Sequence, residues 1–174
     1  ALDKPARFAV SLRIPEWASG ASLKVNGETV DLAAATVDGY ARIEREWKSG
    51  DSVDLDIPLE ARALWANPLV RQDAGRKALM RGPLVYCVEA TDNGAGLNGI
   101  ELGELGDAKE RTIAELNGAV ALDLPVTRDE ADWGSSLYRT EPPRAKPATA
   151  RFVPYHLWDN RAPGEMLVWM RSGE

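Results

Sequence analysis

The sequence predicts an all-β fold, an antiparallel β-sandwich of jelly-roll-like type arranged as two sandwich lobes. Many short apolar segments alternate with polar residues at the period of two that a half-buried strand requires, and turn residues separate them. No segment sustains a helical period over more than two turns. With 44% hydrophobic residues, the 174-residue chain can bury a core of this kind.

The first lobe is expected in residues 1–63. Apolar side chains alternate along residues 8–14 until Pro15 ends the run, which predicts a strand. Asn26-Gly27 supplies two residues of positive φ, as a tight hairpin requires, and residues 40–57 predict a second hairpin around Trp47–Asp51. Because the chain lacks an initial Met and is already in a strand at Phe8, we expect a fragment whose first lobe is incomplete at its N-terminus.

The second lobe is expected in residues 64–174, around a central strand at Leu84–Glu89. This apolar run is too short for a helix, contains β-branched and aromatic residues, and follows a Gly-Pro break. Residues 59–70 fit either a strand or a short helical turn, and we favour the strand.

The rest of this lobe contains strands separated by turn-rich segments. Residues 90–107 are rich in Gly, Asn and Asp and predict a long surface loop with a brief strand at residues 100–102. Residues 120–126 predict a half-buried strand, which Pro125 places at a sheet edge. Residues 150–154 and 166–170 predict the last two strands.

Charge and composition exclude several classes of function. The net charge of −6 is scattered, and no Lys/Arg cluster could neutralise a row of phosphates, so a nucleic-acid partner is not expected. No apolar run approaches the roughly 20 residues needed to cross a bilayer, so we expect a soluble chain without a membrane partner. The cellular compartment stays open.

Few residues could carry catalysis. Cys87 could be a nucleophile, but it lies within an apolar strand, which predicts a buried and unreactive thiol. His156 is the only histidine, and one Cys with one His makes a poor zinc site. The aspartates lie in turn-like settings and no glycosidase-like carboxylate pair stands out, so no residue is assigned a catalytic or metal-binding role.

Six tryptophans suggest a second possibility, because flat aromatic faces stack on sugar rings. Trp17, Trp47 and Trp133 lie beside turns, where exposure would suit a sugar platform, whereas Trp169 lies in the last strand and is expected in the core. A free-standing carbohydrate-binding β-sandwich is therefore the alternative function.

Several motifs occur together in an order that resembles the β-L-arabinofuranosidase family of glycoside hydrolases, family 127. They are Leu12-Arg-Ile-Pro-Glu-Trp17, Val25-Asn-Gly27, Gly39-Tyr40, Trp47-x-x-Gly-Asp51, Arg81–Cys87, Asp92-Asn93, Pro154–Arg161 and Gly164–Trp169. The resemblance covers only the C-terminal β-sandwich region of that family. It implies a parent protein with an N-terminal (α/α)₆ barrel, in which a zinc-bound cysteine is the nucleophile of a retaining reaction. No position here matches that zinc motif, so the resemblance implies no cofactor in this fragment.

The resemblance implies a non-catalytic role, in which the sandwiches brace the barrel of the same parent chain, form a homodimer contact, or do both. We expect the contact at Tyr155, Trp158, Asn160 and Arg161, because aromatic residues and Arg are enriched at interfaces. In the opposing interpretation, Trp158 plugs the end of its own sandwich and Arg161 pairs locally. The substrate sugar of the parent is left undetermined.

Overall fold

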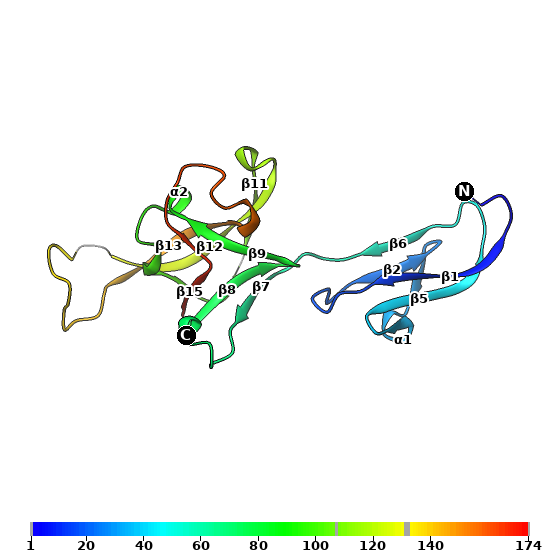
Figure 1. The fold of residues 1–174 in the computed structure, drawn as a ribbon, viewed down its shortest axis with the longest axis horizontal. Helices are drawn as coiled ribbons and strands as arrows, with labels where there is room; N and C mark the ends of the chain where they lie inside the picture. The colour runs from blue at the N-terminus through cyan, green and yellow to red at the C-terminus, as the bar shows by residue number, and fades with distance from the viewer. Residues whose placement is uncertain (1, 107, 131–132, 174) are drawn as a thin grey trace. The chain divides into compact units, whose positions relative to one another are not determined.

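The computed structural model describes residues 2–106, 108–130 and 133–173, and it divides the chain into two compact units, Ala1–Glu60 and Ala61–Glu174. Figure 1 colours the first unit blue to cyan and the second green to red. Strands make up 48% of the chain and helices 12%, which confirms the all-β class. The unit boundary lies slightly before the one expected between residues 63 and 64, because the whole of strand β7 (Ala61–Trp65) pairs within the second unit.

The first unit contains two three-stranded antiparallel sheets, ordered β1-β5-β4 and β3-β2-β6. Both sheets contribute buried side chains, among them Leu23 of β2 and Ala41 of β5, so the unit encloses a small core. Its elements are β1 (Ala6–Arg13), β2 (Ser22–Val25), β3 (Glu28–Val30), α1 (Leu32–Ala35), β4 (Thr36–Val37), β5 (Tyr40–Trp47) and β6 (Val53–Asp56).

One of the two expected hairpins of this unit is confirmed and the other is wrong. Asn26 and Gly27 have φ of 52° and 82° and join β2 to β3, as predicted. The turn after Trp47 instead leads from one sheet to the other, because β5 pairs with β1 and β6 pairs with β2. Trp47 is buried and its Nε1 donates to the Phe8 carbonyl (3.1 Å), which ties the end of β5 to β1.

In the second unit, six strands form a hydrogen-bonded ring in the order β8-β9-β13-β12-β10-β15, with β15 pairing back to β8. The pair β10–β15 is parallel, and the other pairs in this strand ring are antiparallel. The strands of the unit are β7, β8 (Arg76–Arg81), β9 (Leu84–Glu89), β10 (Ile100–Leu102), β11 (Lys109–Ile113), β12 (Ala119–Asp129), β13 (Ala145–Pro154), β14 (Met166–Leu167) and β15 (Trp169–Ser172).

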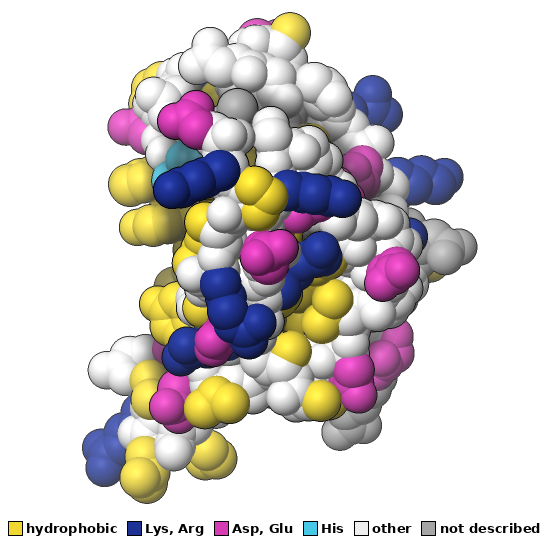
Figure 2. All heavy atoms as spheres, turned by 90° about the vertical axis from the view of Figure 1, so that its right-hand side faces the viewer, with side chains coloured by type: hydrophobic (Ala, Val, Ile, Leu, Met, Phe, Trp, Pro, Cys, Tyr) yellow, Lys and Arg dark blue, Asp and Glu magenta, His cyan; other side chains and the backbone are white. Residues whose placement is uncertain are grey.

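Short helices occupy the connections between these strands. They are η1 (Arg71–Asp73), α2 (Ala90–Asn93), η2 (Leu97–Gly99), η3 (Ala114–Leu116) and η4 (Tyr155–Leu157). None of the helices in the described ranges has the length and apolar character that a membrane-spanning helix needs. On the face shown in Figure 2, basic and acidic side chains lie interspersed among hydrophobic ones.

Each strand of the ring contributes to one core. The cluster consists of Leu79, Tyr86, Val88, Leu97, Ile100, Leu102, Leu122, Leu124, Val126, Ala150, Phe152 and Met170. The ring is thus a sandwich whose two layers are also hydrogen-bonded to each other at their margins, which leaves few open edges. The expected central strand Leu84–Glu89 is confirmed, with β13 on one side and both β8 and β14 on the other.

Two expectations about the second unit are wrong. The brief strand expected at residues 100–102 is confirmed as β10, but residues 90–106 are not simply a surface loop, because Leu97, Ile100 and Leu102 are buried and anchor the segment in the core. Pro125 does not mark a sheet edge, because β12 has β13 on one side and both β11 and β10 on the other. The proline lies between the residues paired with β11, which end at Asp123, and those paired with β10, which begin at Thr127. A missing N–H is tolerated at such a gap.

Candidate functional site

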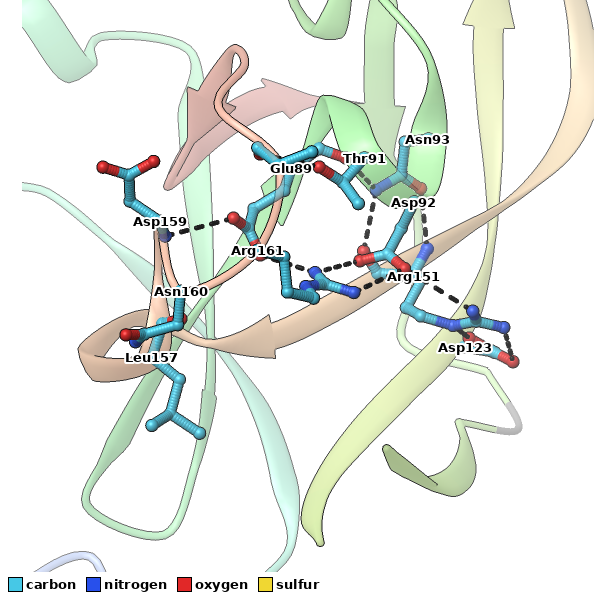
Figure 3. Close-up of polar contacts among 11 residues, drawn as sticks. Glu89, Thr91, Asp92, Asn93, Asp123, Arg151, Leu157, Asp159, Asn160 and Arg161 are labelled. Carbon is cyan, nitrogen blue, oxygen red and sulfur yellow. Dashed lines mark hydrogen bonds and ion pairs between the residues drawn. The ribbon is translucent and has the colours of Figure 1, made fainter. Parts of the chain in front are cut away.

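The expected contact residues lie on and just after η4, in a segment that ion pairs attach to the strand ring (Figure 3). Arg161 Nη2 lies 2.6 Å from Glu89 Oε2 and 2.5 Å from Asp92 Oδ2, and Nη1 donates to Asp92 Oδ1 (3.0 Å). Glu89 is the last residue of β9 and Asp92 lies in α2. The Asp159 amide also donates to Glu89 Oε1 (3.2 Å). The segment is therefore held at two points.

The ion pairs extend across the outside of the ring. Arg151 Nε on β13 lies 2.8 Å from Asp123 Oδ1, and Arg111 Nε on β11 lies 3.0 Å from Asp123 Oδ2. Arg151 Nη1 also lies 3.6 Å from Asp92 Oδ1. We call Glu89, Asp92, Asp123, Arg111, Arg151 and Arg161 the charge cluster: its three carboxylates face three guanidinium groups.

The electrostatics of the charge cluster favour the charged forms. Hydrogen bonds from Arg151 and Arg111 lower the pKa of Asp123 despite its partial burial. Hydrogen bonds to Asp92 and then Glu89 raise the pKa of Arg161, against the effect of burial. A carboxylate whose pKa is lowered in this way, as that of Asp123 is, is poorly suited to proton transfer. The cluster is therefore built to hold the segment in place.

Of the four expected contact residues, two present a surface and two support it. The Tyr155 and Trp158 rings stack with centroids 6.2 Å apart and an interplanar angle of 7°, and the side chains are 44% and 42% exposed. Trp158 therefore does not plug its own sandwich. Asn160 Nδ2 donates to the Leu157 carbonyl (3.0 Å) and steadies the turn, while Arg161 pairs locally in the charge cluster.

An open groove of about 630 Å³ continues from Tyr155. Its lining is mainly apolar and comes from Val85 of β9 and the stretch 166–169, with polar groups that include Asp73 and Arg76. We call Tyr155, Trp158 and this groove the Tyr155 surface. An apolar groove with an aromatic margin is the kind of surface that binds another protein segment.

The other residues considered from the sequence are not brought together. His156 is exposed on η4, whereas Cys87 faces a separate apolar cluster on the outside of β9, formed with Ile113, Leu116, Ala121 and Val153. Burial raises the pKa of Cys87 to about 12, and the nearby Glu89 carboxylate adds to this effect. In residues 2–106, 108–130 and 133–173, no three His, Cys, Asp or Glu side chains are placed to hold a metal ion.

Cys87 is buried, as expected, and its thiol should resist modification in the folded chain. At pH 8 we expect a thiol reagent to label the folded protein at least about 1000-fold more slowly than the unfolded one, because the thiolate is the reacting form. Rapid labelling without denaturant would contradict this.

The raised pKa of Cys87 also makes stability depend on pH. The thiol has a pKa of about 12 in the folded chain and an ordinary value of 9.0, so burial of the neutral thiol stabilises the fold fully below pH 9.0, and this stabilisation is lost as the pH rises toward 12.

The tryptophans differ from the expected sugar platform. Trp47 is buried, and Trp17 and Trp133 are half-buried, as is Trp169, which was expected in the core. The exposed tryptophans are Trp158 and Trp65, at 42% and 61%. Trp65 was missed as a site residue because it lies in an alternating strand pattern, and alternation alone does not show which face of the strand is exposed.

The two structural units correspond to two family models. Residues 1–59 match the model described as "Beta-L-arabinofuranosidase, GH127 middle domain", and residues 61–171 match the "Glycoside hydrolase family 127 C-terminal domain". The chain belongs to glycoside hydrolase family 127. A curated relative, the non-reducing end β-L-arabinofuranosidase of Bifidobacterium longum subsp. longum, is 40% identical over 98% of this chain and 27% of its own length.

Solved family 127 structures have the same fold. A GH127 β-L-arabinofuranosidase from Geobacillus stearothermophilus T6 superposes with a TM-score of 0.90 at 39% identity, over 98% of this chain and 27% of that one. A GH127 β-arabinofuranosidase superposes with a TM-score of 0.84 at 30% identity, over 98% of this chain and 28% of that one. The chain thus spans little more than a quarter of the length of these relatives.

Proposed function

We propose that this chain is the non-catalytic C-terminal β-sandwich portion of a family 127 retaining glycosidase, similar to the β-L-arabinofuranosidases. In this proposal it braces the catalytic (α/α)₆ barrel of the same parent chain. The observation that carries the proposal is the match to a middle and a C-terminal domain that together span 27% of a β-L-arabinofuranosidase.

The chemistry of the described residues supports an accessory role. A zinc-bound cysteine nucleophile requires an ionised thiol with further ligands. Cys87 instead has its pKa raised to about 12 and lies among apolar side chains such as Ile113 and Val153, so its surroundings do not fit a zinc ligand set. Glu89 and Asp92 are both bound to Arg161. No step of a retaining reaction is therefore assigned to these groups.

The Tyr155 surface is the proposed contact with the barrel. It combines exposed aromatic rings, a mainly apolar groove and a supporting charge cluster that holds the segment in one conformation. Pre-organisation of this kind lowers the entropic cost of binding. More than 70% of the relative's length lies outside the matched part, which is ample chain for such a partner.

The coding sequence upstream of Ala1 tests the family role directly. We expect it to encode a helix-rich stretch with paired cysteines and a glutamate, and a stop codon or an unrelated domain would overturn the proposal. The 174-residue chain alone should release no leaving group from a chromogenic β-L-arabinofuranoside. Turnover abolished by Cys87→Ala, or stoichiometric zinc after dialysis, would show that the chain carries the chemistry itself.

The contact itself is tested in the parent protein with the double variant Tyr155→Ala/Trp158→Ala. Removal of two interface aromatic residues should destabilise the barrel–sandwich contact by about 2–4 kcal/mol. We expect a lower melting temperature of the parent and an unchanged melting temperature of the 174-residue chain. Tyr138→Ala, at a residue that is 90% exposed, is the control. A change in sedimentation mass would instead assign the surface to a homodimer, and no change in either measurement would reject the contact.

A carbohydrate-binding module remains the alternative. The observation that favours it is Trp65, an exposed tryptophan beside a small pocket on the second unit.

A further inference from the structure

We propose that Trp65, Lys77 and Glu104 form a binding site for a single neutral sugar ring. The site is a pocket of about 200 Å³ between β7, β8 and the segment that follows β10. Its lining residues are Ala63, Trp65, Lys77, Gly103, Glu104 and Leu105, and none of them lines the Tyr155 surface. The inference does not depend on a catalytic partner.

Lys77 is the most unusual residue of this pocket. It lies near the start of β8, paired with Met170 of β15 on one side and Trp65 of β7 on the other, and it is only 3% exposed. Across the described part of the chain, the Lys77 ammonium makes no hydrogen bond and lies within 4 Å of no carboxylate. The side chain as a whole is enclosed, but its Nζ is not among the fully buried polar atoms that lack a partner, so the ammonium at the pocket is free to donate to a ligand.

Trp65 supplies the apolar wall. It is paired with Lys77 in the register of β7 and β8, and the Lys77 Nζ lies 5.6 Å from the centroid of the Trp65 ring. This cation–π contact orients the ammonium only partly, because it uses none of its three N–H donors in a conventional hydrogen bond. At 61% exposure, Trp65 keeps surface free for a ligand.

These groups together match a sugar better than a simple ion. Sugar hydroxyls both accept and donate, so one can accept from Lys77 while another donates to the Glu104 carboxylate, and the C–H face of the ring can stack on Trp65. Glu104 disfavours an anionic ligand and Lys77 disfavours a cationic one. Ligand pockets for drug-sized molecules usually measure about 300–1,000 Å³, so this smaller one suits a single ring.

The test is an NMR titration of the 174-residue chain with L-arabinose and methyl β-L-arabinofuranoside, following the indole N–H signals. We expect one indole signal to shift saturably with sugar, and Trp65→Phe to remove that signal. Trp158→Phe, at the other exposed tryptophan, should leave the response unchanged. Absence of a saturable shift, an equal shift with glycerol, or a response that depends on Trp158 would each overturn the proposal.

Two further variants test the polar groups. Lys77→Met keeps the apolar stem and removes the donors, and we expect at least about tenfold weaker sugar binding. Because Lys77 is buried, this variant is compared with Glu104→Gln at an exposed position, where an effect on folding is not expected. Weaker binding in Glu104→Gln supports the site even if Lys77→Met fails to fold. Unchanged binding in a folded Lys77→Met variant would reject it.

Discussion

Replacing Arg161 with Met should lower the free energy of unfolding of the second unit by about 3–5 kcal/mol. The change leaves Glu89, only 4% exposed, without its guanidinium partner, and it leaves Asp92, 7% exposed, with only the longer ion pair to Arg151 (3.6 Å). A buried carboxylate without a partner is costly, whereas the same pair in water contributes little. The loss is measured in urea, with amide hydrogen exchange of the β9 and β13 residues as the readout. These amides report on the second unit alone.

The control for Arg161 is Arg42→Met in the first unit, whose unfolding is followed by amide exchange on β1 and β5. Arg42 and Glu44 form an ion pair with side chains 63% and 50% exposed, and its loss should cost less than about 1 kcal/mol. Adding Glu89→Gln and Asp92→Asn to Arg161→Met should recover part of the lost stability, because the unpaired charges are then removed. Equal stability losses for Arg161→Met and Arg42→Met would show that the charge cluster does not hold the segment.

Replacing Phe152 with Ala should cost about 3–5 kcal/mol and weaken the whole strand ring. Phe152 is 0% exposed and sits on β13 between Val88 of β9 and Leu122 of β12, so it contacts the core where two strand pairs meet. The surrounding ring is closed by hydrogen bonds and can collapse only partly into the space that the side chain leaves. Chemical denaturation should show a lower midpoint and faster amide exchange in several strands.

Tyr138→Ala is the matched control for Phe152→Ala. Its side chain is 90% exposed, so its removal should change stability by no more than about 0.5 kcal/mol. If Phe152→Ala were as mild as this control, the strand ring could not be the cooperative unit that its pairings indicate.

Short-range patterns accounted for much of the fold. The strand Leu84–Glu89, the Asn26-Gly27 hairpin and the burial of Cys87 all follow from local rules of alternation, turn geometry and apolar surroundings, and the structure contains each of them. The same rules gave wrong partners for β5 and β6. A period of two specifies which face of a strand is buried, but it does not specify which other strand pairs with it.

The candidate site could be predicted only in part. Tyr155 and Trp158 were found from residue type and are exposed on one segment. Arg161 was placed on the contact surface, yet its partner Glu89 lies 72 positions away in the sequence, and no local signal links the two. Lys77 and Trp65 were not recognised, because a charged residue within a strand pattern reads as an outward-facing one.

The sequence by itself determined the strands, the tight turn and the family, since these depend on neighbouring residues and on ordered motifs. Only the tertiary structure decided that β15 pairs back to β8, that Arg161 is locked beside Glu89, and that the Lys77 ammonium lies in a pocket. Each of these depends on which distant segments meet. The pairing of distant segments is set by the burial of the shared core and by the need of buried charges for partners. Neither can be predicted from a short stretch of neighbouring residues.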